Sequence, residues 1–126
     1  MKVSSFRDLR VWQAGMDLVE KVYRVTEKFP KHEEFGLRAQ IRRAAVSIPS
    51  NIAEGHTREH SKEFLHYLSI AQGSLAELGT QIELAGRLSY IAPREVRDIL
   101  DYTASLAKQM YALRNSLTNR VSRSNP

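Results

Sequence analysis

Residues 40–55 read QIRRAAVSIPSNIAEG, and apolar side chains recur in this stretch at the spacing of an α-helix. The same period continues upstream, so we expect a helix from about Glu34 to Glu54. Gly55 follows at a position that often ends a helix in a left-handed conformation. The main apolar face of this helix consists of Leu37, Ile41, Ala44, Ile48 and Ile52.

The same helix has a second apolar side. Ala39, Val46 and Ala53 recur at heptad spacing nearly opposite the first face, together with Phe35 and Pro49. A helix that is apolar on two sides is buried on two sides, whereas a monomeric four-helix bundle buries one face of each helix. The second side therefore predicts a subunit interface. The alternative is that the alanines are exposed and occur there because they favour helix formation.

Pro49 lies inside the helical pattern. It lacks a backbone N–H, and its ring clashes with the carbonyl of Ala45, so we expect a kink. The apolar period passes through Pro49 without a change of phase. This continuity favours one kinked helix over a helix that stops at Ile48 and is followed by a short one.

A first helix is expected over residues 6–28, where Ser5 and Asp8 fit a capping box and Pro30 ends the element. The face that we assign to it from the 4-3 spacing consists of Trp12, Met16, Val19, Tyr23 and Thr26.

Two further helices are expected over residues 61–87, with Ser61 as the N-cap, and from Pro93, a favoured first helical residue, to about residue 118. Both keep a 4-3 apolar alternation over about three heptads, as bundle seams do. Short loops join antiparallel neighbours. The sequence therefore predicts an all-α protein, an antiparallel up-down four-helix bundle over residues 1–118, with a basic, disordered tail over 119–126. The two seams are Phe64, Leu68, Ala71, Leu75, Leu78, Ile82 and Ala85, and Val96, Ile99, Thr103, Leu106, Met110, Leu113 and Leu117.

A row of polar residues lies beside the main apolar face of the second helix, and another lies on the third helix. Buried polar groups need hydrogen bonds and buried charges need partners. We expect Arg43 to pair with Glu54 or Glu77, in a structural or interface network that fixes helix register or the subunit contact. The alternative is a binding site. The two rows are Gln40, Arg43, Ser47, Asn51 and Glu54, and Ser74, Glu77 and Gln81.

The formal net charge of +5 is concentrated in the first and last segments, because residues 1–31 hold seven Lys/Arg against four acids and residues 93–126 hold six against three. Basic surfaces attract phosphates by releasing counterions. The alternative is a solvated tail that serves only solubility. The candidate nucleic-acid-binding residues are Arg7, Arg10, Lys21, Arg24, Lys108, Arg114 and Arg120.

Two short motifs match metal-binding patterns, but their surroundings in the sequence argue against metal binding. Residues 56–60, HTREH, match the H-x-x-E-H zinc-peptidase pattern, which needs both histidines on one helix, but they fall in an expected turn. Glu63 and His66 match E-x-x-H, half of a di-iron signature, and no second E-x-x-H occurs. G-x-S-x-G and phosphate-binding glycine loops are also absent. We therefore expect a protein that is not an enzyme and that binds no metal or cofactor.

The sequence has no cysteine, which fits a reducing compartment. Its beginning lacks the apolar core of a signal peptide, and no apolar run reaches the ~18–20 residues that span a bilayer. A cytoplasmic protein without membrane partners is expected.

Residues 40–55 resemble the central signature of the 23S rRNA intervening-sequence protein family, also called the four helix bundle protein family. FRDLRVW (residues 6–12) is similar to the opening of that family, and Phe64-Leu65 and GSLAEL (residues 73–78) are similar to its third helix. The resemblance covers nearly the whole chain up to about Leu117. It implies a four-helix bundle that assembles as a ring-shaped homopentamer, which agrees with the two apolar sides of the second helix.

The family has no agreed catalytic residues. A related branch, the accessory variability protein of diversity-generating retroelements, is a basic pentamer that binds nucleic acid and a reverse transcriptase. By resemblance, the positions that match the signature are structural or interface residues only: Gln40, Arg43, Ser47, Asn51, Glu54 and Glu77.

The function that we expect is non-enzymatic binding of RNA or DNA by a homo-oligomer, through phosphate contacts and without sequence specificity. The alternative is a protein-interaction scaffold, for a reverse transcriptase or another partner.

Overall fold

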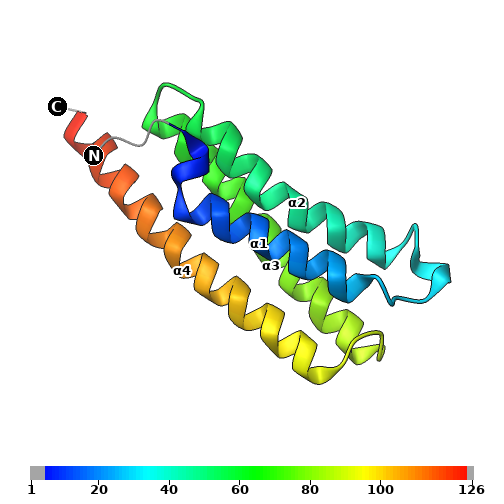
Figure 1. The fold of residues 1–126 in the computed structure, drawn as a ribbon. Coiled ribbons are helices and arrows are strands. Elements are labelled where there is room, and N and C mark those ends of the chain that lie inside the picture. The colour runs from blue at the N-terminus through cyan, green and yellow to red at the C-terminus, as the bar shows by residue number, and fades with distance from the viewer. Residues whose placement is uncertain (1–4, 125–126) are drawn as a thin grey trace.

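The computed structural model describes residues 5–124, and every regular element in that range is helical. The order is η1 (Phe6–Asp8), α1 (Arg10–Thr26), η2 (Lys31–Glu33), α2 (Leu37–His56), α3 (Ser61–Arg87) and α4 (Pro93–Ser124), where η denotes a 3-10 helix. Figure 1 shows the four α-helices packed side by side along one long axis. The expected all-α four-helix bundle is confirmed.

Contacts between α2 and α3 set the relative direction of these helices. Next to their shared turn, a Cβ built on Gly55 would lie 2.8 Å from atoms of both Phe64 and Tyr67. Farther from the turn, Ser74 Oγ donates to Ser47 Oγ at 2.9 Å. Residue numbers fall along α2 as they rise along α3, so the two helices run in opposite directions.

The core lies where the expected seams of α2, α3 and α4 meet. The five residues of the main apolar face of α2 and the seven of the α3 seam are all buried. In α4, Val96 and Leu113 are only half-buried, and the other five seam residues are buried. The largest side chains with no exposed surface include Leu18, Ile41, Ile48, Ile52, Leu68, Leu78, Ile82, Ile99, Leu106 and Met110.

The start of the first helix differs from the prediction. Ser5 caps η1 instead of α1, because Arg7 N–H donates to its Oγ at 3.2 Å. Leu9 is extended, with φ −74° and ψ 128°, and separates η1 from α1. The α-helix therefore begins at Arg10 rather than Phe6.

The face that α1 buries is also one residue away from the face that we assigned. Val11, Leu18 and Val22 lie in the core, whereas Trp12 and Val19 are half-buried and Met16 and Tyr23 are exposed. Of the assigned face, only Thr26 is buried. Helix α1 has two adjacent apolar stripes, and the spacing alone does not say which of them faces the core.

Gly55 does not end α2 as predicted. The helix begins at Leu37, after η2 and the N-cap Gly36, and continues through Gly55 to His56. No glycine in residues 5–124 has a positive φ. Gly55 instead permits the close approach of α3, because any side chain there would collide with Phe64 and Tyr67.

Helix α2 passes through Pro49 as one element, which excludes the alternative of a break after Ile48. Pro49 is buried against α1, where a Cβ on Gly15 would lie 3.4 Å from its Cβ. The kink itself stays a prediction. Part of the second apolar side of α2 is thus covered by α1, while Val46 is 40% exposed and Phe35 90% exposed.

The start of α3 and the end of α4 also differ from the prediction. His60, rather than Ser61, is the N-cap residue of α3, and its side chain accepts no capping hydrogen bond. Helix α4 continues to Ser124, beyond the end expected near residue 118, because the sequence after Leu117 contains no Gly or Pro before Pro126. Within residues 5–124, no helix combines the length and the hydropathy that a membrane span needs.

Candidate nucleic-acid interface

Two of the seven predicted basic residues lie in the C-terminal half of α1 and are engaged by acids. Lys21 Nζ is 3.5 Å from Asp98 Oδ2 of α4 and lies over the ring of Tyr102, 5.3 Å from its centroid. Arg24 is 3.9 Å from Glu20, one turn earlier. These ion pairs reduce the charge that α1 offers to a phosphate.

Arg10 and Arg120 lie at the end of the bundle where α1 begins and α4 ends. Each lines a surface hollow, of about 450 Å³ for Arg10 and about 410 Å³ for Arg120. The two hollows share Leu9 and Leu113, so they adjoin. The structure therefore brings together two residues that are 110 positions apart in the sequence (120 minus 10).

Three basic residues that the sequence analysis did not assign also line the hollow of Arg120: His56, Arg58 and His60. They belong to the H-x-x-E-H stretch, which was weighed only as a metal motif. Glu59 lines the hollow as well. Within residues 5–124, no group of three or more His, Asp or Glu residues could hold a metal ion.

Arg58 is held in place at this end. Its Nη2 donates to Tyr67 Oη at 2.7 Å and is 3.4 Å from Glu54 Oε2, and the guanidinium lies over the Tyr67 ring. The side chain still exposes 39% of its surface. We call Arg10, His56, Arg58, His60 and Arg120 the basic end.

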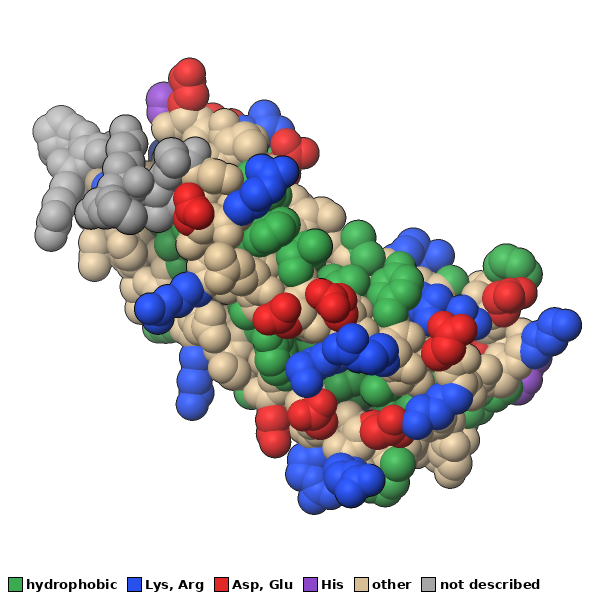
Figure 2. All heavy atoms as spheres, viewed as in Figure 1, with side chains coloured by type: hydrophobic (Ala, Val, Ile, Leu, Met, Phe, Trp, Pro, Cys, Tyr) green, Lys and Arg blue, Asp and Glu red, His purple; other side chains and the backbone are tan. Residues whose placement is uncertain are grey.

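The other three predicted basic residues differ in how their side chains contact the rest of the protein. Arg114 is half-buried and donates to Gln72 Oε1 of α3, so it joins two helices. Arg7 lies over the ring of Phe6, 4.6 Å from its centroid. Lys108 is exposed and has no ion pair with any residue of the described range. Figure 2 shows acidic and basic side chains interspersed over the visible face rather than one basic field.

The predicted polar network forms only in part. Asn51 Nδ2 donates to the carbonyl oxygen and to Oγ of Ser47, at 2.8 and 3.0 Å, and Ser47 Oγ accepts from buried Ser74. Glu54 pairs with Arg58, not with Arg43.

Arg43 and Glu77 are exposed, and neither has an ion pair within residues 5–124. The expected pairing of Arg43 with Glu54 or Glu77 is therefore wrong for the single chain. These two charges border a hollow of about 320 Å³ between α2 and α3, which we call the polar face. It is lined by Gln40, Arg43, Ala44, Ser47, Ser74 and Glu77.

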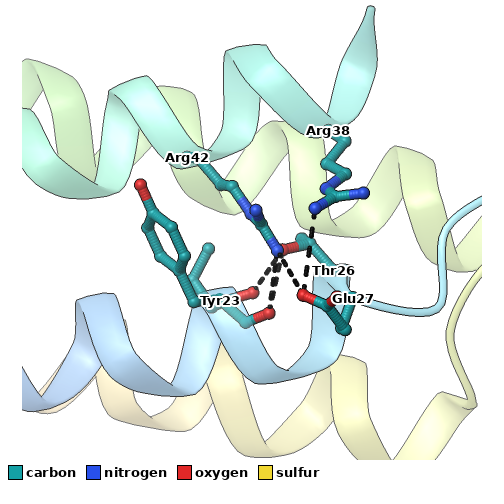
Figure 3. Close-up of polar contacts among 6 residues, drawn as sticks. Tyr23, Thr26, Glu27, Arg38 and Arg42 are labelled. Atoms are coloured by element: carbon teal, nitrogen blue, oxygen red, sulfur yellow. Dashed lines mark hydrogen bonds and ion pairs between the residues drawn. The ribbon is translucent and has the colours of Figure 1, made fainter. Parts of the chain in front are cut away.

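The adjacent Arg42, rather than Arg43, is hydrogen-bonded within the bundle, and its partners lie on α1 and in the residue that follows it, not at Glu54 or Glu77. Its Nε donates to Thr26 Oγ1 at 2.9 Å, and its Nη2 donates to the carbonyl oxygen of Tyr23 at 3.1 Å and to Glu27 Oε2 at 3.2 Å. Figure 3 shows this cluster, in which Arg38 also approaches Glu27. Arg42 thus ties the end of α1 to the beginning of α2.

A second hollow of about 320 Å³ lies between α1 and α2 and is mostly apolar. Figure 2 shows apolar side chains exposed in a row along this side of the molecule. We call it the apolar groove. It is lined by Trp12, Met16, Val19, Val46, Pro49, Ser50 and Ala53.

Comparison with known proteins bears on this arrangement. No curated protein matches the chain. Among solved structures, a protein of unknown function from the S23 ribosomal protein family of Bacteroides thetaiotaomicron superposes with a TM-score of 0.77 at 22% identity, covering 83% of this chain and 95% of that one. At this identity the likeness supports the fold alone. The profile of the family described as "23S rRNA-intervening sequence protein" matches residues 7–112, most of the sequence, and this match shows that the chain belongs to that family.

Proposed function

We propose that the protein is a non-enzymatic homo-oligomer that binds nucleic acid through the phosphate backbone. The observation that supports this proposal is the basic end, where Arg10, Arg58 and Arg120 converge from α1, from the α2–α3 turn and from α4 around two adjoining hollows. Guanidinium groups suit phosphate because they present a planar fork of N–H donors.

The proposed binding does not read sequence. Base-specific recognition of RNA uses exposed bases stacked on aromatic platforms, often on a β-sheet. The elements over residues 5–124 are all helices, and Phe64, the one Phe, Tyr or Trp that lines the hollow of Arg120, is buried. Phosphate contacts alone position a duplex but carry no sequence information.

Self-association supplies the affinity that one small basic end lacks. The apolar groove, with Val46 40% exposed, is a surface that a second chain would cover. Repeating the basic end around a ring raises avidity without strengthening any single contact. The homopentamer that the family resemblance implies would present five basic ends.

A titration of fluorescent RNA and DNA duplexes at two salt concentrations tests the proposal, with the mass of the protein measured in the same sample. We expect salt-sensitive binding by an oligomer, with the affinity falling steeply as salt rises. The variant Arg10→Ala with Arg120→Ala should weaken binding and flatten the salt dependence. Arg97→Ala is the control, because Arg97 is exposed near the opposite end of α4 and has no ion pair in the described range.

Binding that is equally strong at low and moderate salt would contradict phosphate contacts. An oligomer that binds neither duplex at low salt would favour the second candidate function, a protein-interaction scaffold. The exposed Phe35, 90% accessible at the turn before α2, is the observation that favours that alternative.

A further inference from the structure

The hollow of Arg120 is built where three elements meet at one end of the bundle. It is lined by His56 at the end of α2, by Arg58 and His60 in the turn that follows, and by Arg120 of α4. Figure 1 shows the end of α2, the start of α3 and the end of α4 at the same end of the molecule. A hollow of about 410 Å³ between cationic side chains suits a compact anion with several oxygen atoms.

Two of the side chains that line this hollow are held in position by their neighbours. Arg58 donates to Tyr67 Oη at 2.7 Å, and the ring of His56 stands edge-on against Phe64, with 5.8 Å between the ring centroids. His60 is exposed, and its side chain makes no capping hydrogen bond to α3. Side chains that are already positioned lose little conformational freedom when a ligand binds.

The charge of the hollow favours an anion that carries more than one negative charge. Arg58 and Arg120 are always protonated, and Glu59 is the one acidic residue that lines the hollow. Glu54, 3.4 Å from Arg58, offsets part of the positive charge. An internal phosphate of a strand carries one negative charge, whereas a terminal phosphomonoester carries about −1.5 to −2 at pH 7 and presents three acceptor oxygens. The hollow therefore suits a phosphomonoester better than a phosphodiester.

The adjoining hollow of Arg10 suits the rest of a terminal nucleotide. Its volume of about 450 Å³ lies in the range of small-ligand sites, and apolar side chains form most of its wall. Leu9 and Leu113 line both hollows, so groups bound in the two hollows would be neighbours. A nucleotide joins a compact anion to a flat base with apolar faces, which is the same combination. The apolar residues of this wall are Leu9, Val11, Ala112 and Leu113.

We infer that the basic end holds the phosphorylated end of a nucleic-acid strand, with the terminal phosphomonoester in the hollow of Arg120 and the terminal base in the hollow of Arg10. This inference rests on the proposed function and names the part of the nucleic acid that the basic end recognises. A strand leaves a terminal phosphate in one direction only, so a hollow walled by three elements admits it. An internal phosphate would need the strand to pass out of the hollow on both sides.

RNA and DNA hairpins of one sequence, labelled in the loop so that both strand ends are free, test the inference. One hairpin has a 5′-phosphate, one has a 3′-phosphate, and one has hydroxyl groups at both ends. We expect one of the phosphorylated hairpins to bind about tenfold more tightly than the hydroxyl hairpin, and that hairpin identifies the end that is recognised. Equal affinities for the three hairpins would overturn the inference.

Two substitutions at exposed positions of the hollow should change this preference in opposite directions. Glu59→Gln removes the acid and should raise the preference for the phosphorylated end about two- to threefold. Ser116→Asp adds an acid and should abolish the preference. The controls make the same changes at exposed positions outside the hollow: Glu34→Gln before α2, and Ser105→Asp about 16 Å along α4 from Ser116. Both controls should keep the wild-type preference.

Free nucleotides test the placement of the base. In NMR titrations, adenosine 5′- or 3′-monophosphate should shift the ring signals of His56 and His60 at a lower concentration than inorganic phosphate does, because only the nucleotide has a base to place against Leu9 and Leu113. Adenosine, which lacks the phosphate, should leave both signals unmoved. Equal responses to the nucleotides and to inorganic phosphate would overturn the placement of the base.

This inference and the proposed function fail on different results. Hairpins that bind equally, with an affinity that falls steeply as salt rises, would overturn the preference for an end and leave the proposed function standing. An unchanged preference in both Glu59→Gln and Ser116→Asp would show that the phosphate lies outside this hollow. A response to adenosine monophosphate without hairpin binding would contradict the proposed function and identify a free nucleotide as the source of the phosphomonoester. A response to neither would overturn both.

Discussion

Ser89 is the one non-glycine residue in the described range with a positive φ, at 64°. It ends α3 in a left-handed conformation. Tyr90 N–H donates to the carbonyl of Ala85 at 2.9 Å and Ser89 N–H to that of Gly86 at 3.0 Å, the two hydrogen bonds of a Schellman motif. An L-residue pays a steric cost in this conformation that glycine does not.

Ser89→Gly should therefore stabilise the fold, by about 0.5–1 kcal/mol once the greater freedom of glycine in the unfolded chain is subtracted. Urea denaturation of the two proteins measures the change. Ser89→Ala keeps the Cβ atom and should bring no gain. A Ser89→Gly protein no more stable than the wild type would mean that the turn relaxes when glycine replaces serine.

Glu33 makes the start of α2 sensitive to acid. The N–H of Leu37 donates to Glu33 Oε1 at 2.9 Å, and Tyr90 Oη donates to Oε2 at 2.9 Å. The hydrogen bond from Leu37, and after it that from Tyr90, lowers the pKa of Glu33 below its ordinary value of 4.5. A lowered pKa means that the folded state binds this proton less readily than the unfolded chain does.

The stability due to Glu33 is thus fully present above pH 4.5 and is lost as the pH falls through the lowered pKa of the folded state. Glu33→Gln keeps an amide oxygen for the N–H of Leu37 but has no charge to lose. Between about pH 5 and pH 3, the urea midpoint of the wild type should fall more than that of Glu33→Gln. Parallel profiles would show that Glu33 does not contribute to acid unfolding.

At the scale of the elements, Arg42 joins α1 to α2. It donates to Thr26, to the carbonyl of Tyr23 and to Glu27, and its guanidinium lies 4.3 Å from the centroid of the Tyr23 ring. Its side chain exposes only 17% of its surface. Hydrogen bonds that involve a charged group stabilise by about 1.5–3 kcal/mol each, so Arg42→Ala should lower the free energy of unfolding by about 2–3 kcal/mol.

Arg43→Ala is the matched control, because the neighbouring arginine is exposed and unpaired in the single chain. Measured at a concentration low enough to dissociate any oligomer, it should change the stability by less than about 0.5 kcal/mol. Equal effects of the two substitutions would show that the α1–α2 cluster adds nothing to stability.

The elements that could be predicted are those with one apolar stripe. Helix α3 spans Ser61–Arg87, the predicted range, and its whole seam is buried, because its apolar residues follow a single 4-3 alternation. Helix α1 has Val11, Leu18 and Val22 beside Trp12 and Val19, and two adjacent stripes fit the same period. Packing against the other helices, which the period does not describe, decides between them.

The predicted roles of Gly55 and Arg43 were wrong for a related reason. A glycine after a helical pattern fits both a helix end and a close helix crossing, and only the position of Phe64 shows that Gly55 serves the crossing. Arg42 and Arg43 are chemically identical neighbours that point about 100° apart. Which of them meets α1 depends on the rotation of α2 in the bundle, which is a tertiary property.

At the scale of the molecule, the sequence indicated basic charge at both ends of the chain but could not show where that charge meets. Arg10 and Arg120 come together because α1 starts where α4 ends, a consequence of the bundle topology (Figure 1). His56, Arg58 and His60 join them because the α2–α3 turn lies at the same end. Conversely, Lys21 forms an ion pair with Asp98 of α4. Counting charges along the sequence does not reveal this pair.

The proposed function predicts how nucleic-acid binding depends on assembly. In an oligomer, one duplex engages the basic ends of several copies, and each phosphate contact adds about 0.9 to the slope of log affinity against log salt. Val46→Glu places a charge in the apolar groove, so this variant should be monomeric and offer one basic end. The slope of its log affinity against log salt should fall to the value for a single basic end. Its affinity for the duplex should drop by about 10²–10⁴-fold as avidity is lost. The control Val46→Thr, which places no charge in the groove, should keep the wild-type slope.

The same titration distinguishes loss of avidity from loss of the site. Arg10→Ala with Arg120→Ala should lower the slope while the protein stays oligomeric, whereas Val46→Glu should lower it with every basic residue in place. If monomeric Val46→Glu binds with the wild-type slope, one copy contacts each duplex and the oligomer does not gather phosphate contacts. The basic end would then act alone, and assembly would serve a purpose other than nucleic-acid affinity.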